Sequence, residues 1–119
     1  MARILIIDDS ALSRRMMRAI LEPAGHEVLE ATDGITGLER YFLDKPELVM
    51  LDLTMTGMHG LEVLEKLREM DPAARVIVAT ADIQSSTRTM VAAAGATGMI
   101  NKPLAAETVL QAVTEALRG

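Results

Sequence analysis

The sequence predicts an α/β domain in which a doubly wound, five-stranded parallel sheet is covered by helices on both faces. Two observations lead to this prediction: short apolar runs alternate with segments of helical periodicity, and helix-breaking residues stand between them. A chain of 119 residues has the usual size of one domain. We therefore expect residues 1–119 to fold around a single sheet.

The apolar runs have the composition of buried parallel strands, which are rich in aliphatic residues because helices cover both of their faces. They lie at residues 3–8, 27–31, 47–52, 75–80 and 97–101. Parallel strands require crossover connections, and these are right-handed in nearly all proteins. Successive strand–helix units of this kind build one sheet between two layers of helices.

The segments between the runs carry apolar residues three or four positions apart, which is the spacing of a helix that buries one face. Examples are Met16 with Ile20, Met17 with Leu21, Leu38 with Phe42, Leu61 with Leu64 and Leu67, and Val109 with Val113 and Leu117. The fourth helix is expected to begin near Gln84. Helix-breaking residues stand at the expected helix ends, at Pro23 and Gly25, Lys45-Pro46, Asp71-Pro72 and Gly95.

Composition and charge argue against several classes of function. The longest aliphatic runs are far shorter than the about 20 residues of a membrane helix, and the first residues lack the pattern of a secretory signal. We expect a cytoplasmic protein without a membrane partner. The sequence has no cysteine, so disulfides and thiolate metal sites are excluded. Its net charge of −5, from 17 acidic and 12 basic residues, argues against direct binding of nucleic acid.

Polar side chains stand at the ends of four predicted strands, where doubly wound sheets bind their ligands. They are Asp8 and Asp9, Asp52, Thr80, and the Asn101-Lys102-Pro103 segment. Three carboxylates close together need raised pKa values or a cation, and hard oxygen ligands favour Mg²⁺, with Mn²⁺ as an alternative. An aspartate is also a competent nucleophile toward phosphorus when a metal and a lysine offset the developing charge. Lys102 would supply that positive charge.

These residues resemble the response-regulator receiver domain of two-component signalling, and especially its free-standing CheY-like members. The resemblance covers essentially the whole chain. Its marks are Asp8-Asp9-Ser10, residues 52–60 with the sequence DLTMTGMHG, Ala79-Thr80-Ala81, and Lys102-Pro103. The resemblance implies the flavodoxin-like (βα)5 fold, with strand order 2-1-3-4-5.

The resemblance also implies roles for individual residues. Asp52 would be the phosphoacceptor, which takes a phosphoryl group from a sensor histidine kinase or a histidine phosphotransfer protein in a Mg²⁺-dependent reaction. Asp9 would bind the metal directly, Asp8 through water, and Thr54 through its backbone carbonyl, while Asp52 completes the site. Thr80 would hydrogen-bond the phosphoryl group and Lys102 would pair with it. The Lys102-Pro103 peptide bond is expected to be cis.

The implied protein is a phosphoacceptor signalling domain rather than an enzyme with a separate substrate, although it would react with small phosphodonors and lose its own phosphoryl group by hydrolysis. Phosphorylation would bias the loops and the fourth helix, and so switch contacts with a downstream protein that the sequence does not identify. No effector domain follows the last expected helix in this sequence, so the expected output is a protein contact.

Some positions depart from the family pattern. Met99 stands where many relatives have an aromatic residue, so coupling of an aromatic rotamer to the switch residue Thr80 cannot operate, and a flexible thioether would serve instead. Thr56 stands where proline is common and His59 where Asp or Asn is common. Thr54 and Asp82, each two positions beyond a site residue, occupy places where relatives tune attack by water. They are expected to set the lifetime of the phosphoryl group.

Simpler interpretations remain open for each residue. Asp8-Asp9-Ser10 also fits a helix N-cap, and Asp82 fits the N-cap of the fourth helix or the mouth of the site. Alone, Thr80 and Lys102 are an ordinary strand residue and an ordinary surface residue. His26 and His59 are expected at the surface without a role. Three arginines of the first helix, Arg14, Arg15 and Arg18, fit a solvated face slightly better than a surface that docks a kinase phosphodonor domain.

Two other classes of function use the same architecture or the same nucleophile. A flavin-binding electron carrier would need a phosphate-binding loop after the first strand, where Asp8 and Asp9 would repel phosphate. An aspartate-dependent phosphohydrolase would need a second acid–base carboxylate, and no Asp-x-Asp pair follows a strand here. Stoichiometry separates these classes, since a receiver accumulates one phosphoryl group whereas a hydrolase turns over.

Overall fold

The computed structural model describes residues 1–55, 59–82 and 84–118, so the expectation of a less rigid loop at Thr56 falls outside the described residues. Strands and helices alternate along the chain. The strands are β1 (Arg3–Ile7), β2 (Glu27–Ala31), β3 (Leu48–Asp52), β4 (Val76–Thr80) and β5 (Gly98–Asn101). The helices are α1 (Ala11–Leu21), α2 (Gly34–Asp44), α3 (Gly60–Met70), α4 (Ser85–Ala93) and α5 (Ala106–Arg118).

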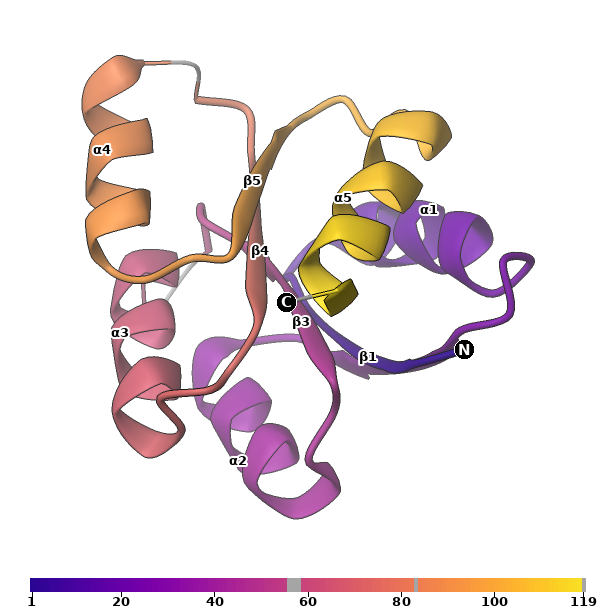
Figure 1. Cartoon of the computed structure of the whole chain (residues 1–119), viewed down its shortest axis with the longest axis horizontal. Coiled ribbons are helices and arrows are strands. Elements are labelled where there is room, and N and C mark those ends of the chain that lie inside the picture. Colours follow the sequence, from indigo (N-terminus) through magenta and orange to yellow (C-terminus); the bar gives the residue numbers. More distant parts are fainter. Residues whose placement is uncertain (56–58, 83, 119) are drawn as a thin grey trace.

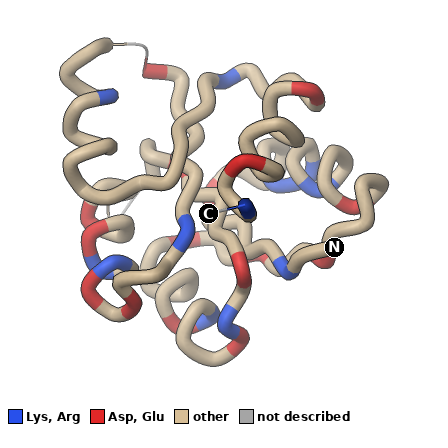
Figure 2. Tube along the Cα trace, viewed as in Figure 1, with Lys and Arg blue, Asp and Glu red and all other residues tan. Residues whose placement is uncertain are grey.

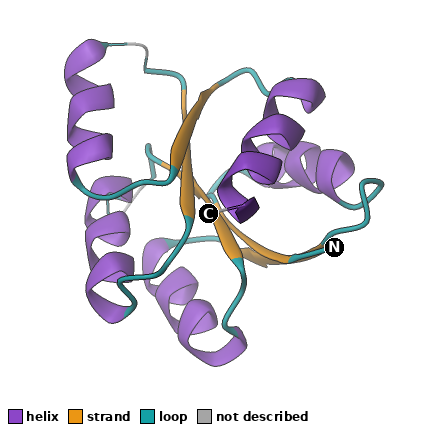
Figure 3. Ribbon diagram, in the orientation of Figure 1, coloured by secondary structure: helices purple, strands orange, loops and turns teal. Residues whose placement is uncertain are grey.

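The strands, drawn orange in Figure 3, form one parallel sheet. Their order is β2-β1-β3-β4-β5, which confirms the predicted fold class and strand order. The chain first builds outward from β1 to β2 and then crosses back to β3 on the other side of β1. The strand order therefore reverses between β1 and β3. At such a switch point the connections leave the sheet on opposite faces, and a crevice opens at the carboxyl ends of the strands.

Helices cover both faces of the sheet, with α1 and α5 on one side and α2, α3 and α4 on the other (Figure 1). Alternate residues of each strand enter opposite cores, because side chains of a strand point to opposite faces in turn. In β1, for example, Ile4 and Ile6 pack against Met17 of α1 and Val113 of α5. Their neighbours Leu5 and Ile7 belong to the core on the other face. This explains why the strands carry no polar alternation in the sequence.

The predicted strand boundaries agree with the structure to within one residue, and the helices end where breakers were expected. Lys45, for example, caps α2 in the left-handed region at φ 46°, and Gly95 follows α4 at φ 95°. Gly95 suits this conformation because it has no Cβ. Local chemistry in the sequence thus sets the length of each helix. Over the described part of the chain, every helix is too short or too polar to cross a membrane.

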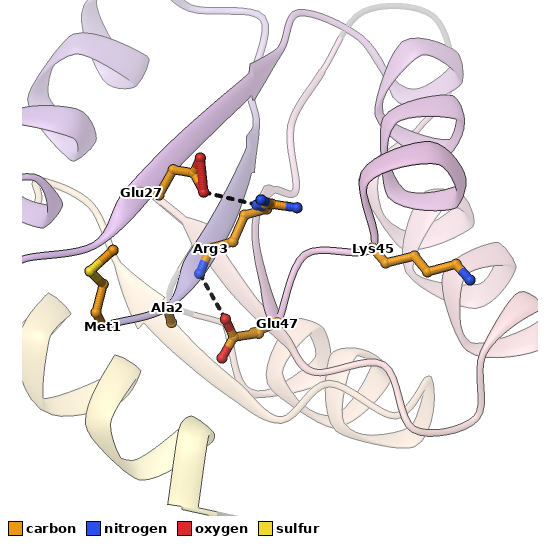
Figure 4. Close-up of a pocket in the computed structure, with 6 residues that line it drawn as sticks. All are labelled: Met1, Ala2, Arg3, Glu27, Lys45 and Glu47. Atoms are coloured by element: carbon orange, nitrogen blue, oxygen red, sulfur yellow. Dashed lines mark hydrogen bonds and ion pairs between the residues drawn. The ribbon is translucent and has the colours of Figure 1, made fainter.

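At the amino ends of the strands, Arg3 forms hydrogen bonds with groups from neighbouring segments (Figure 4). Its Nε donates to Glu27 at 2.9 Å, its Nη1 to the Asp44 carbonyl at 3.1 Å, and its backbone N–H to Glu47 at 3.1 Å. These groups are largely exposed, so the ion pair adds little to stability. Three of the buried polar residues, Asp8, Asp52 and Thr80, lie at the opposite edge of the sheet.

Candidate functional site

The carboxyl edge of the sheet gathers side chains that are far apart in the sequence. Asp52 and Thr80 are the last residues of β3 and β4, which are paired in parallel, while Asp8 directly follows β1. Each of these three side chains is buried, with at most 5% of the residue exposed. Lys102 enters from the segment that follows β5. The structure thus brings Asp8, Asp52, Thr80 and Lys102 together at this edge, whereas Asn101 at the end of β5 is exposed.

Lys102 links the two buried carboxylates. Its Nζ lies 3.3 Å from Oδ2 of Asp8 and 3.4 Å from Oδ1 of Asp52, and it also donates to the Ser13 hydroxyl at 3.3 Å. The Lys102-Pro103 peptide bond is cis. Lys102 is therefore a partly buried cation in the acidic cluster, and the interpretation as an ordinary surface lysine is wrong.

The carboxylates fit a hard divalent cation. Oxygen atoms of Asp8, Asp9 and Asp52 lie within 4.8 Å of one another, and Asp9 is the exposed member of the group. An oxygen-only donor set without histidine or cysteine suits Mg²⁺ or Mn²⁺. The exposed carboxylate leaves one side of the cluster open to water, as Mg²⁺ sites require because this ion dehydrates reluctantly.

The surroundings of Asp52 work against its ionisation. Burial and the nearby charge of Asp8 raise the pKa of the Asp52 carboxyl group. The Lys102 amine and the N–H of Thr54, which donates to Oδ1 of Asp52 at 3.3 Å, oppose that rise. A cation bound between these carboxylates would favour the charged form of Asp52, which is the form that can act as a nucleophile.

The start of α3 presses against the end of β3. A Cβ added at Gly60 would lie 2.6 Å from the carbonyl oxygen of Asp52 and 2.5 Å from the Cα of Leu53. The Gly60 N–H donates to the Leu53 carbonyl at 3.2 Å. Only a residue without a side chain permits this approach of helix and strand, so Gly60 helps to place the backbone of Asp52.

A chain of hydrogen bonds leads from Thr80 toward α4. The Thr80 hydroxyl accepts from the N–H of Asp82 at 3.0 Å, and the carboxylate of Asp82 accepts from the N–H of Gln84 at 2.9 Å and from the hydroxyl of Thr87 at 2.5 Å. Hydrogen bonds from Thr87 and Gln84 lower the pKa of Asp82. Asp82 is therefore ionised at neutral pH.

Of the two interpretations left open for Asp82, that of the N-cap residue of α4 is wrong, since Gln84 occupies that position. Asp82 lies two residues earlier but still binds the Gln84 N–H and Thr87. It also lines a pocket with Thr54, His59 and Met90. The two candidate lifetime-tuning residues, Thr54 and Asp82, thus border the same pocket.

The sequence did not single out Ser13 and did not connect Arg14 with the site. Ser10 is the N-cap of α1, so the capping interpretation of this segment is correct alongside the acidic cluster. Ser13, one helical turn later, contacts Lys102, and Arg14 Nη1 donates to the backbone carbonyl of Asp8 at 2.7 Å. The i, i+3 spacing of Ser10 and Ser13 was the feature of the sequence that could have placed Ser13 near the site, because residues with this spacing share a helix face.

The three arginines of α1 differ from one another. Arg14 and Arg18 pair with Glu30 of β2, and Arg18 also pairs with Glu22. Arg15 is exposed. Basic positions are interspersed with acidic ones along the whole trace (Figure 2). The arginines are therefore not a uniform basic patch.

Met99 in β5 is partly buried and packs against the core on the α2, α3 and α4 face. Its neighbour across the sheet is Val78, and Thr80 pairs with Asn101. The thioether thus belongs to the layer of side chains beneath α4.

The fold and the site together define a doubly wound α/β domain that collects three carboxylates and a lysine at the carboxyl edge of its sheet. Residues 4–114 match the family model described as response regulator receiver domain. The chain belongs to this family, and it is a CheY-like receiver domain of a two-component response regulator. Phosphorylation on aspartate is the mechanism expected for the family.

Relatives of known identity match over nearly the full chain. The chain is 40% identical over 116 residues to chemotaxis protein CheY of Bacillus subtilis, covering 97% of each protein. It is 37% identical over 114 residues to chemotaxis protein CheY of Thermotoga maritima, covering 95% of each. The solved structure of Vibrio cholerae chemotaxis protein CheY4 superposes with a TM-score of 0.93 at 29% identity, covering 98% of this chain and 99% of that one.

Proposed function

We propose that Asp52 is the phosphoacceptor of a single receiver domain spanning residues 1–119. The observation that carries this proposal is the position of the Asp52 carboxylate: it is buried, lies with Asp8 and Asp9 in a cluster that fits a divalent cation, and is 3.4 Å from the Lys102 amine. Response regulators receive phosphoryl groups from histidine kinases and act on downstream targets.

The proposed reaction is a phosphoryl transfer to a carboxylate. An Oδ atom of Asp52 forms a bond to phosphorus while the bond from phosphorus to the donor's histidine nitrogen, or to the oxygen of a small donor, breaks. The leaving group keeps the electron pair of that bond. Lys102 offsets negative charge on the transferred oxygens, and the Thr80 hydroxyl donates a hydrogen bond to one of them.

Asp8, Asp9, Asp52 and the backbone carbonyl of Thr54 are the proposed ligands of Mg²⁺, with Mn²⁺ as an alternative. When bound, the ion would supply positive charge next to the transferred phosphoryl group. In the absence of phosphate, Lys102 already compensates part of the charge of two of these carboxylates. We propose that the same amine turns to the phosphoryl group after transfer.

The proposed donor is a sensor histidine kinase or a histidine phosphotransfer protein, and the proposed location is the cytoplasm. Reaction with small phosphodonors and self-catalysed hydrolysis are part of the proposal. The output is a switched contact with a downstream protein, and Thr80 and Met99 take part in the switch. Arg15, the exposed arginine of α1, is the better candidate for contact with the donor, because Arg14 and Arg18 are paired within the domain.

The test is the intact mass of the protein after incubation with acetyl phosphate, with and without Mg²⁺. Wild type should gain one adduct of about 80 mass units only with Mg²⁺, and Asp52→Asn should gain none. Release of phosphate in many turnovers without an adduct would favour a phosphohydrolase instead. An adduct of the same size on Asp52→Asn would reject Asp52 as the acceptor.

A further inference from the structure

The side chain of Arg14 joins three parts of the molecule. It projects from α1 with 15% of its surface exposed. Its Nη1 donates to the backbone carbonyl of Asp8 at 2.7 Å, and its Nε donates to Oε1 of Glu30 in β2 at 3.0 Å. A single guanidinium group thus connects the first helix, the neighbouring strand β2 and the main chain of a residue of the acidic cluster.

Glu30 fixes the orientation of this guanidinium group. Burial opposes its ionisation, but hydrogen bonds and charges from Arg18 and Arg14 outweigh that effect and lower the pKa of Glu30. Arg18 donates to the second oxygen of Glu30 through Nε at 2.9 Å and through Nη2 at 2.6 Å. The ionised Glu30 therefore neutralises part of the positive charge beside the acidic cluster and holds Arg14 in place.

The carbonyl group that Arg14 binds belongs to the peptide unit between Asp8 and Asp9. A peptide unit is planar, so fixing its oxygen fixes the direction in which the chain leaves one Cα and reaches the next. The other polar groups of Asp8 are bound as well: its N–H donates to the Ala31 carbonyl at 3.1 Å, Oδ1 accepts from the Ser10 N–H at 2.9 Å, and Oδ2 accepts from the Lys102 amine at 3.3 Å. Arg14 holds the remaining group, which lies between the two carboxylates.

We propose that Arg14 is a positioning residue of the cation site. By fixing the peptide plane between Asp8 and Asp9, it sets the relative orientation of their two carboxylates, and Glu30 supports it from β2. This inference rests on the proposed function, because it takes these carboxylates as ligands of Mg²⁺. Groups that orient metal ligands without touching the metal commonly change metal affinity when they are removed.

The positive charge of Arg14 should lower Mg²⁺ affinity, whereas its positioning role should raise it. The sign of the change in affinity when Arg14 is replaced therefore tests the proposal. A guanidinium near the site repels a divalent cation, so the loss of its charge alone would strengthen Mg²⁺ binding. Loss of the fixed peptide plane would weaken it, because both carboxylates must then be ordered when the ion binds. The positioning role requires weaker binding.

Arg18 provides a matched control. Arg14→Ala and Arg18→Ala each remove one arginine and its ion pair with Glu30, but only the first removes the bond to the Asp8 carbonyl. Arg14→Lys keeps the positive charge but replaces the guanidinium with one ammonium group. It should therefore retain part of the Mg²⁺ affinity that Arg14→Ala loses. Thermal unfolding of each purified variant identifies any that does not fold.

The experiment is titration calorimetry of the full chain with Mg²⁺, without a phosphodonor. We expect the dissociation constant to rise roughly tenfold for Arg14→Ala, to rise less for Arg14→Lys, and to stay within about twofold for Arg18→Ala. Hydrogen exchange of Mg²⁺-free protein should become faster in residues 8–10 of Arg14→Ala and not of Arg18→Ala. That second measurement detects the loosened segment without metal and keeps the test valid if one variant is less stable.

An unchanged or smaller dissociation constant for folded Arg14→Ala would overturn the positioning role and leave the proposed function intact. Equal weakening in Arg14→Ala and Arg18→Ala would also overturn it, since the effect would then follow the ion pairs with Glu30. If wild type itself bound no Mg²⁺, both the positioning role and the proposed cation site would fail. These results are distinguishable in the same set of titrations.

Discussion

The Nζ of Lys102 lies 3.4 Å from Oδ1 of Asp52, although 50 positions separate the two residues in the sequence. The same amine lies at a similar distance from Asp8, so one ammonium group pairs with two buried carboxylates. Such an arrangement leaves a net negative charge in a buried site. That imbalance determines how the site should respond to mutation, pH and metal.

Replacing Asp52 should stabilise the metal-free protein. Burial and the charge of Asp8 raise the pKa of Asp52, so its ionised form opposes folding. We expect Asp52→Asn to raise the free energy of unfolding at neutral pH by on the order of 1 kcal/mol, measured by urea denaturation. A variant less stable than wild type would show that Lys102 more than compensates the charge.

The pH dependence of this difference follows from the same shift. A carboxyl group with a raised folded-state pKa favours the folded state fully below its unfolded-state pKa, and loses that contribution as pH rises through the folded-state value. The stability difference between Asp52→Asn and wild type should therefore be small near pH 3.5 and grow toward neutral pH, since model aspartate titrates at about 3.9. A difference that does not change with pH would exclude a titrating Asp52 as its cause.

Replacing Lys102 should lower the stability of the metal-free protein but increase the stabilisation that Mg²⁺ provides. Lys102→Met keeps most of the apolar stem and removes the charge between Asp8 and Asp52. Breaking such a partly buried pair should cost roughly 1–3 kcal/mol, because two carboxylates lose their counter-charge. The rise in Tm on adding Mg²⁺ should then exceed that of wild type. An equal or smaller rise would mean that the lysine and the cation do not compete for the same carboxylates.

Asp82 should control how long the phosphoryl group persists. It borders one pocket with Thr54 and accepts hydrogen bonds from Gln84 and Thr87. We expect Asp82→Ala to change the rate of phosphoryl loss severalfold, measured by intact mass over time after the donor is removed. Thr87→Val keeps the carboxylate but removes its hydroxyl partner, and so separates the charge of Asp82 from its orientation. An unchanged decay rate in Asp82→Ala would reject the tuning role.

Gly60→Ala should be strongly destabilising. The new Cβ would lie 2.5 to 2.6 Å from backbone atoms of Asp52 and Leu53, which cannot move without distorting the end of β3. We expect a loss of roughly 2–3 kcal/mol in unfolding free energy and slower phosphorylation from acetyl phosphate. Gly98→Ala is the control, since its Cβ would meet Ile77 at an ordinary 3.8 Å. Similar stability of the two variants would contradict the close packing of α3 on β3.

Tyr41→Phe should cost roughly 1 kcal/mol of unfolding free energy, because the Tyr41 hydroxyl donates to Oδ2 of Asp71 at 2.7 Å across the α2–α3 face. Burial, followed by the bond to Asp71, raises the pKa of Tyr41 to about 12. This tyrosine stabilises the fold below its ordinary pKa near 10 and loses that contribution as pH rises through the folded-state value. Tyr41 is the single tyrosine of the chain, so absorbance reports it alone. Tyrosinate formation at pH 10 in folded protein would contradict the prediction.

The sequence by itself determined the architecture and the main members of the site. Strand runs and breakers are local signals, so their boundaries came out within one residue, and parallel strands place Asp8, Asp52 and Thr80 at one edge by topology alone. Turn-forming and strand-forming tendencies depend on short segments of sequence. The folded chain keeps the elements that they favour, because the cores on both faces of the sheet bury the same aliphatic residues.

The tertiary structure decided which groups touch. Three arginines of α1 look alike in the sequence, yet Arg14 binds the Asp8 carbonyl, Arg18 binds Glu30, and Arg15 faces solvent. Asp82 likewise binds Gln84 and Thr87 without being the N-cap. Helix periodicity gives the face on which a side chain lies but not the strand or loop that packs against that face. The group that a side chain binds on a neighbouring helix, strand or loop is therefore determined only when the layers of the domain pack together.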